Sequence, residues 1–246
     1  MNIIAAVQAR MGSSRLPNKV MASIGGVPMI AQVCLRTRLA ETINHVVLSI
    51  PDTVANDALD YFARQAHIYC CRGAEEDLLA RTIGTVEEHY RVDGVVRITG
   101  DCPLVDSKII DQVVDVFTGG NYDYVSNVFP RRTYPAGIAV EVYSVDLLYH
   151  LDEAIQAPRY REYYMAWLWE HAQHYSTYNV ELEQDLSSKR WTVDEMDDLL
   201  FVRAVYDELG LGNWGMAEVL DLLERKPEIE AINAHITIEP FKGLER

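Results

Sequence analysis

Three cations and several small residues share one short segment near the N-terminus, directly after an apolar run. The stretch QARMGSSRLPNK contains, in order, Arg10, Gly12, Ser13, Ser14, Arg15 and Lys19. Small residues let the backbone turn and direct its N–H groups inward, and the cations add positive charge. The segment therefore predicts a cradle for a triphosphate, and the alternative is a solvated basic turn.

An aspartate follows a second apolar run in the same way. Asp101 comes after Gly100 and residues 94–99 (GVVRIT), just beyond the end of an expected buried strand. Ligands of open α/β sheets bind at the carboxyl ends of strands. A triphosphate arrives with Mg²⁺, which takes oxygen ligands and usually one or two protein carboxylates. Asp101 is thus a candidate metal ligand, and the alternative is an ordinary turn aspartate.

The N-terminal segment contains neither a Walker A motif nor a GxGxxG motif. Its spacing instead resembles the signature A-R-x-x-S-[ST]-R-L-P-x-K of acylneuraminate and ketodeoxyoctonate cytidylyltransferases and of the related spore-coat polysaccharide proteins. The matching residues are Ala9, Arg10, Ser13, Ser14, Arg15, Leu16, Pro17 and Lys19. The resemblance implies that this segment, Gly12 included, binds the triphosphate of CTP, and that Arg10, Arg15 and Lys19 act in catalysis together with Asp101.

Two further segments carry the same resemblance. Residues 100–104 (GDCPL) match G-D-x-P-L, whose aspartate is a metal ligand in that family. Residues 191–199 (WTVDEMDDL) resemble [VI]-D-x-x-x-D-L, which implies that Asp194 joins Asp101 at the metal. Alternatively, Asp194 is the N-cap of an acidic helix start. The other carboxylates up to Asp198 are expected to be solvated.

A weaker match covers residues 73–81 (GAEEDLLAR), which resemble the G-x-x-x-D-[VL]-L-x-R stretch of the spore-coat relatives. The resemblance implies that Gly73 and Asp77 lie near the nucleotide. The alternatives are that Asp77 caps a helix and that Arg81 lies on a solvated face.

The resemblance implies an enzyme that transfers CMP from CTP to an acidic sugar and releases pyrophosphate, with Mg²⁺, in surface polysaccharide biosynthesis. It also implies a homodimer. The choice of CTP rests on the resemblance, because no side chain identifies the base.

The acceptor is less well defined. Relatives that activate ulosonic acids commonly read Y-P-D-G-[LF]-D-V-E, whereas residues 134–141 read YPAGIAVE, with Ala136 and Ala139 in place of both aspartates. The loss of two carboxylates indicates a different or smaller acceptor. Candidates to bind an acidic acceptor are Arg131, Arg132, Arg159 and Arg161, each of which is otherwise a surface arginine.

Three other functions remain open. The first is a nucleotidyltransferase that acts on a phosphorylated or phosphonylated alcohol, which the missing aspartates favour. A sugar-nucleotide-dependent glycosyltransferase would need a DxD-like motif, which residues 123–125 (DYV) do not supply. A noncatalytic nucleotide-binding scaffold would not need both the cradle cations and the carboxylates.

These residues require a doubly wound sheet to position them. Alternating apolar strands and helices predict a mostly parallel, Rossmann-like α/β fold, and the resemblance implies the nucleotide-diphospho-sugar transferase type. The expected elements are strands at 3–7, 45–50, 67–71 and 94–99, with helices at 27–40, 55–66 and 78–90. One domain over residues 1–246 is expected, with about 127–145 as a small antiparallel elaboration for dimerisation or acceptor binding.

Downstream the expected elements are helices at 144–155, 159–174, 194–209 and 214–225, and a strand at 190–193. Ser144 is the expected cap of the first of these helices. Trp167 and Trp169 are expected in the core or a dimer interface rather than in a stacking platform.

Composition excludes several classes of function. The formal net charge of −15 disfavours nucleic acid as a partner, because phosphate backbones bind through positive charge. The four cysteines lack the spacing of a zinc site and the density of a disulfide scaffold. No apolar run reaches the roughly 18 residues that span a bilayer, so a cytoplasmic protein without membrane contact is expected.

Overall fold

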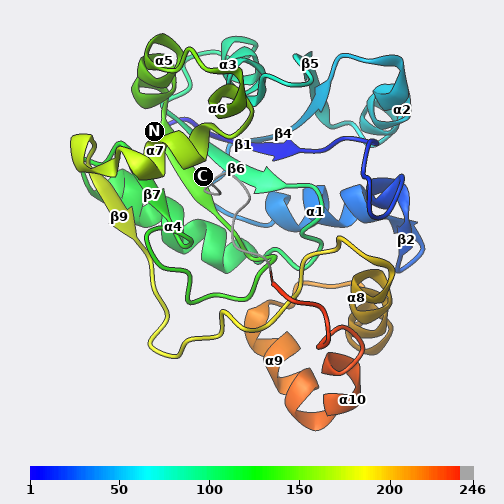
Figure 1. Cartoon of the computed structure of the whole chain (residues 1–246). Coiled ribbons are helices and arrows are strands. Elements are labelled where there is room, and N and C mark those ends of the chain that lie inside the picture. The colour runs from blue at the N-terminus through cyan, green and yellow to red at the C-terminus, as the bar shows by residue number, and fades with distance from the viewer. Residues whose placement is uncertain (239–246) are drawn as a thin grey trace.

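The computed structural model describes residues 1–238, which form a seven-stranded sheet flanked by helices (Figure 1). In spatial order the strands are β5 (Tyr69–Gly73), β4 (His45–Pro51), β1 (Ile3–Gln8), β6 (Gly94–Thr99), β8 (Glu141–Ser144), β7 (Tyr124–Ser126) and β9 (Thr177–Asn179). The four strands from β5 to β6 are parallel, β8 is antiparallel to both of its neighbours, and β9 is parallel to β7. The predicted fold class is confirmed.

The strand order places two chemically important segments side by side. β1 lies between β4 and β6, and Gln8 at its end pairs in register with Thr99 at the end of β6. The chain proceeds from β1 toward β4 and β5 and then returns to the other side for β6. Ligands of open α/β sheets bind where the strand order reverses in this way. The segments that follow Gln8 and Thr99 therefore meet at one edge of the sheet.

β1 is buried on both faces, as its apolar sequence predicts. Ile3, Ala5 and Val7 join one hydrophobic core, and Ile4 and Ala6 join the other. Alternation of side chains along a strand produces this division.

Helices cover both faces of the sheet (Figure 1). The face with Ile3 packs against α1 (Met29–Arg38), α2 (Asp57–Gln65) and α4 (Ser107–Gly119). The same hydrophobic core continues into residues of α8 (Met196–Leu209), α9 (Met216–Arg225) and α10 (Pro227–Glu230). The opposite face packs against α3 (Leu78–Glu87), α5 (Val145–Ala154), α6 (Pro158–Glu162) and α7 (Tyr164–Glu170). Short 3₁₀ helices complete the list at Lys19–Met21, Val54–Asn56 and Ala172–His174. No helix of residues 1–238 is both long and apolar enough to cross a bilayer.

Most predicted elements are present, and the Ser144 cap is confirmed because its hydroxyl accepts the N–H of Leu147. The helix predicted from residue 27 instead begins at Met29. Val27–Pro28 (β3) pairs with Ser23–Ile24 (β2) across Gly25 and Gly26, both at positive φ, which suits a two-residue hairpin turn.

Two predictions for the second half were wrong. The helix predicted over 159–174 is broken into α6, α7 and a 3₁₀ turn, because Tyr163 leaves helical geometry at φ −120° and ψ 52°. The segment predicted as a strand at 190–193 forms one bridge, between Arg190 and Ala136. Its backbone is divided between two neighbours, since the Trp191 N–H bonds Ala136 and the Val193 N–H bonds Asp101.

Candidate active site

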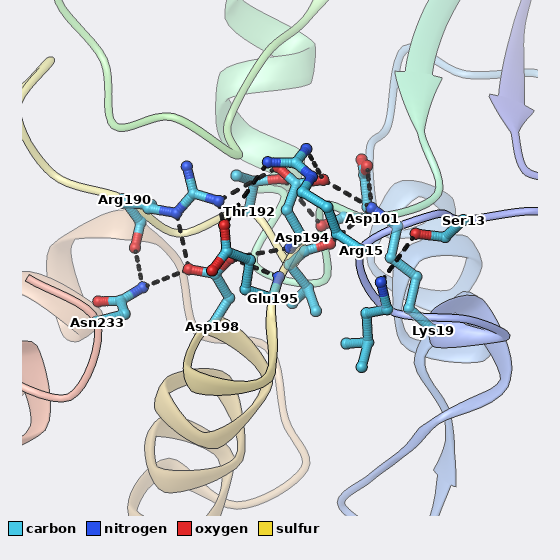
Figure 2. A network of polar contacts seen from close by, with 12 residues as sticks. Ser13, Arg15, Lys19, Asp101, Arg190, Thr192, Asp194, Glu195, Asp198 and Asn233 are labelled. Atoms are coloured by element: carbon cyan, nitrogen blue, oxygen red, sulfur yellow. Dashed lines mark hydrogen bonds and ion pairs between the residues drawn. The ribbon is translucent and has the colours of Figure 1, made fainter. Parts of the chain in front are cut away.

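Lys19 joins the two predicted metal ligands. Its Nζ lies 2.9 Å from Asp101 Oδ2 and 2.8 Å from Asp194 Oδ1, and it also donates to the Val193 carbonyl at 2.8 Å (Figure 2). The Lys19 side chain is only 10% exposed. Two carboxylates separated by 93 positions in the sequence therefore lie close together, on either side of the Lys19 ammonium.

Backbone geometry at the ends of β1 and β6 fixes this arrangement. The Gly100 N–H donates to the Gln8 carbonyl at 2.8 Å. A Cβ at Gly100 would lie 2.9 Å from the Ala9 Cβ, so only glycine permits this close approach. Asp101 is carried by this turn, and its carbonyl accepts the N–H of Val193 at 2.9 Å, which aligns the loop that bears Asp194.

The charges of Lys19 and Asp101 stabilise one another. Burial by itself lowers the pKa of Lys19, but attraction to Asp101 and Asp194 outweighs burial and leaves that pKa raised. Burial likewise raises the pKa of Asp101, but the Lys19 ammonium outweighs it and leaves the pKa of Asp101 lowered. Both groups are therefore charged at neutral pH.

Asp194 is held by two further cations. Arg15 Nη2 lies 2.9 Å from its Oδ1, and Arg190 Nη2 lies 3.3 Å from its Oδ2. The N-cap of α8 is Glu195, which forms a capping box with Asp198, so the alternative that Asp194 is the cap is excluded. Asp198 was predicted to be solvated and is instead fully buried, bound to Arg190 through two bonds of 2.8 Å. A fully buried carboxylate needs such a partner.

The cradle lines a cavity of about 460 Å³, called the first cavity. The predicted residues that line it are Ala9, Arg10, Gly12, Ser13, Ser14, Arg15, Lys19, Asp101 and Asp194. The alternative of a solvated basic turn is wrong for Lys19, which is buried.

The segment 73–81 contributes residues to the wall of the first cavity, but they are not the predicted ones. Neither Gly73 nor Asp77 lines this cavity. The Asp77 carboxylate caps α3 by accepting the Ala80 N–H and is paired with Arg161. Gly73 permits close packing of Arg81, because a Cβ there would lie 2.9 Å from the Arg81 Cγ.

Arg81 is the residue of this segment that brings positive charge to the first cavity, which Glu75 also lines. Arg81 is 6% exposed rather than solvated, it lines the cavity, and its Nη1 donates to the carbonyls of Ala74 and Glu75. Burial, and then the nearby charge of Arg10, lower the pKa of Arg81. An anion in the first cavity would relieve the repulsion between these two cations.

A second cavity of about 690 Å³ adjoins the first. The residues that line both are Arg15, Arg97, Thr99, Asp101, Tyr163 and Asp194. Ala136 and Ala139 lie in the wall of the second cavity only, together with Val128 and Trp169. The two candidate metal ligands thus stand at the border of the two spaces.

One of the four candidate acceptor arginines lines the second cavity. Arg132 does so, and its Nη2 donates to the Ser187 carbonyl at 3.2 Å. Burial lowers the pKa of Arg132. No carboxylate of residues 1–238 forms an ion pair with Arg132, whereas Arg15, Arg97 and Arg190 in the same wall are all ion-paired.

The other three candidates are directed elsewhere. Arg131 pairs with Asp185, Arg161 pairs with Asp77 and Asp152, and Arg159 contacts the Tyr160 ring.

Sequence reasoning missed Arg97 and Glu141. Arg97 Nη1 lies 2.6 Å from Glu141 Oε1, and the hydroxyls of Tyr124 and Tyr143 donate to Glu141 Oε2. Burial lowers the pKa of Arg97, but Glu141 outweighs it and leaves that pKa raised. The sequence did contain an indication of this pair, because Arg97 lies inside the apolar run 94–99 and a charge in a buried strand needs a partner. Trp169 lines the second cavity beside this pair and stacks on Phe129.

The donor set fits a magnesium ion that comes with a triphosphate. Asp101 and Asp194 both bind the Lys19 ammonium, so their carboxylates lie close enough to share a cation. Carboxylate oxygens are ligands that Mg²⁺ prefers. Residues 1–238 contain no group of three or more His, Cys, Asp or Glu side chains placed to hold a metal by themselves. An ion held by these two aspartates would therefore complete its coordination with phosphate and water.

A protein-family model described as cytidylyltransferase matches residues 4–200. The spore coat polysaccharide biosynthesis protein SpsF of Bacillus subtilis is 27% identical over 92% of this chain and 96% of its own length. An 8-amino-3,8-dideoxy-manno-octulosonate cytidylyltransferase of Shewanella amazonensis is 33% identical over 48% of each chain. The solved structure of a cytidylyltransferase from Leptospira borgpetersenii covers 98% of this chain and 100% of its own at 27% identity, with a TM-score of 0.90.

Proposed function

This chain belongs to the cytidylyltransferase family, and we propose that it transfers CMP from CTP to a small acidic sugar of the ulosonic type, with release of pyrophosphate. One observation carries the proposal: the two aspartates meet at Lys19, on the border between a cation-lined cavity and a second cavity that contains Arg132. A nucleotide in the first cavity would then present its α-phosphate to an acceptor in the second.

The first cavity supplies charge for the departing pyrophosphate. The oxygen of an acceptor hydroxyl attacks the α-phosphorus in line and loses its proton to solvent, a new phosphorus–oxygen bond forms, and the bond to the bridging oxygen breaks. Pyrophosphate leaves with that electron pair. Arg10, Arg15 and Lys19 bind and orient the phosphates and stabilise the charge that develops on them, which is the main protein contribution in phosphoryl-type transfer.

Asp101 and Asp194 would hold Mg²⁺ at the border. When bound, the ion supplies Lewis-acid polarisation of phosphate oxygens and of the acceptor hydroxyl. Lys19 contacts both carboxylates in the free protein, so its ammonium must exchange one of these contacts for a phosphate oxygen when metal and nucleotide enter.

Arg132 would bind the acidic group of the acceptor. It is the arginine in the wall of the second cavity without an ion pair among residues 1–238, and an anion placed beside it would supply the missing partner. The relative from Shewanella amazonensis is named for an octulosonate, which carries a carboxylate. The name of the Bacillus subtilis relative supports a role in polysaccharide biosynthesis.

A phosphorylated or phosphonylated alcohol is the second candidate acceptor. Ala136 and Ala139 give the second cavity two apolar wall positions, so the groups that would bind sugar hydroxyls there are missing. Arg132 would bind a phosphate as readily as a carboxylate.

Pyrophosphate release tests the proposal directly. The purified chain is incubated with CTP, Mg²⁺ and one of four acceptor classes: ulosonic acids, their esters, phosphorylated alcohols, and neutral sugars. We expect release with ulosonic acids and little with their esters. Release with phosphorylated alcohols alone would select the second candidate, and release with neutral sugars alone would contradict both. A larger thermal shift with UTP or ATP than with CTP would contradict the base assignment.

A further inference from the structure

Asn233 connects the C-terminal helices to the loop that carries Asp194. Its side chain is 3% exposed, and its Nδ2 donates to the Arg190 carbonyl at 3.0 Å and to Asp198 Oδ1 at 3.0 Å (Figure 2). Asn233 follows α10 and lies beyond residues 4–200, which the family model matches. The amide therefore holds two residues of a distant loop at once.

Asp198 is the centre of this network. Its Oδ2 accepts the N–H groups of Asp194 and Glu195 at 2.9 Å each, and both of its oxygens accept bonds from Arg190. Asn233 adds a further bond to Oδ1 of this fully buried carboxylate. Asn233 and Asp198 line neither cavity, whereas Arg190 lines the second, so the two former residues can act on a ligand only through their neighbours.

The network acts on Asp194 in two ways. Asp198 fixes the Asp194 backbone through its N–H, and Arg190 fixes the side chain by donating to Oδ2. Oδ1 is thereby left to bind Lys19 and Arg15 at the border of the two cavities.

We infer that Asn233 is a positioning residue that, through Arg190 and Asp198, orients Asp194 as a metal ligand. The inference rests on the proposed magnesium site. Partners behind a metal ligand commonly account for about 10- to 100-fold in metal affinity.

Binding of Mn²⁺ to the full chain with CTP, measured by electron paramagnetic resonance, tests this without an acceptor. We expect Asn233→Ala to weaken Mn²⁺ binding about 10- to 100-fold and to leave CTP binding without metal within about twofold. Asp198→Asn, which retains a similar shape but removes the charge bound by Arg190, is expected to weaken Mn²⁺ binding in the same way.

Lys189→Ala is the matched control. Lys189 Nζ pairs with Glu230 at 2.6 Å and so joins the same two segments without contacting Asp194. We expect its Mn²⁺ affinity to equal that of the parent chain, so that a general loosening of the C-terminal segment can be distinguished from loss of positioning.

The outcomes separate the two proposals. If the parent chain with CTP does not bind Mn²⁺, the proposed metal site fails. If the parent binds Mn²⁺ and Asn233→Ala binds it equally well, the positioning role alone is overturned. Equal weakening in Lys189→Ala, or an equal loss of metal-free CTP binding in Asn233→Ala, would also overturn it. If Asn233→Ala does not fold, the Asp198→Asn measurement decides.

Discussion

The two adjoining cavities are built in different ways. The first is lined mainly by one continuous loop after β1 and by the turn after β6, two segments that register in the sheet brings together. The second is assembled from residues 128–141, 163–169 and 190–192, where the chain departs from the parallel pattern. Under the proposed function, a short continuous motif would therefore bind most of the nucleotide, while residues dispersed in the sequence would bind the acceptor.

The cations that line the two cavities also differ in how they are paired with carboxylates. The cations of the first cavity include Arg15 and Lys19, which are paired with carboxylates of the site itself and would exchange them for phosphates. In the second cavity Arg132 has no such partner among residues 1–238, while Arg97 is committed to buried Glu141. The first cavity also contains Arg10 and Arg81, whose mutual repulsion an anion would relieve, so both cavities present cations to an anionic ligand.

The largest loss of turnover is expected from a substitution at the border between the two cavities. Asp101→Asn removes one of two charges that would hold the metal, so turnover in CTP-dependent pyrophosphate release should fall about 100- to 1000-fold. Asp115→Asn, a change at an exposed position of α4, is the control and should retain activity. Unchanged turnover in Asp101→Asn would refute the metal role.

Arg132→Ala should affect acceptor binding but not CTP binding. Loss of a charge-assisted contact should raise the KM of an acidic acceptor about tenfold or more, because such contacts contribute roughly 1.5–3 kcal/mol, while the KM of CTP changes little. The neighbour Arg131 points to Asp185, so Arg131→Ala provides the matched comparison. Equal acceptor KM values for the two variants would remove Arg132 from the acceptor site.

Ala139→Asp places a carboxylate in the wall of the second cavity. A new hydrogen-bond acceptor contributes about 0.5–1.5 kcal/mol, so preference should move by about three- to tenfold toward acceptors with more hydroxyl groups. The ratio of kcat/KM between polyhydroxylated and phosphorylated acceptors measures the change. A ratio equal to that of the parent would mean that this wall position does not contact the acceptor.

Asp77→Ala should affect stability rather than nucleotide binding. Loss of the cap of α3 should lower the free energy of unfolding by about 1 kcal/mol, measured by denaturant titration, with the KM of CTP within about twofold. A tenfold rise in the KM of CTP with stability unchanged would instead indicate that Asp77 contributes to nucleotide binding.

The sequence was most informative where local pattern determines position. The apolar runs predicted β1, β4 and β6, and the loop after β1, which carries Lys19, begins beside the turn after β6, which carries Asp101. Asp194 was placed by resemblance, and the contact through Lys19 agrees with that placement.

The rest depended on contacts between distant segments. Arg97 needs Glu141, and Asp198 needs Arg190 and Asn233, and neither pairing follows from spacing along the chain. The segment 190–193 has the composition of a strand, but its hydrogen bonds are divided between Ala136 and Asp101. Of four similar arginines, only tertiary packing distinguished Arg132.

In the proposed metal site, the Lys19 ammonium between the two aspartates would influence the order in which metal and nucleotide bind. A divalent ion that diffuses in alone must expel a cation already held by three oxygen atoms. An ion that enters on a nucleotide brings phosphate oxygens toward which the displaced ammonium can turn, which offsets the lost contacts. If the proposed metal site holds, the free protein would bind a divalent ion weakly, and metal and nucleotide would bind together.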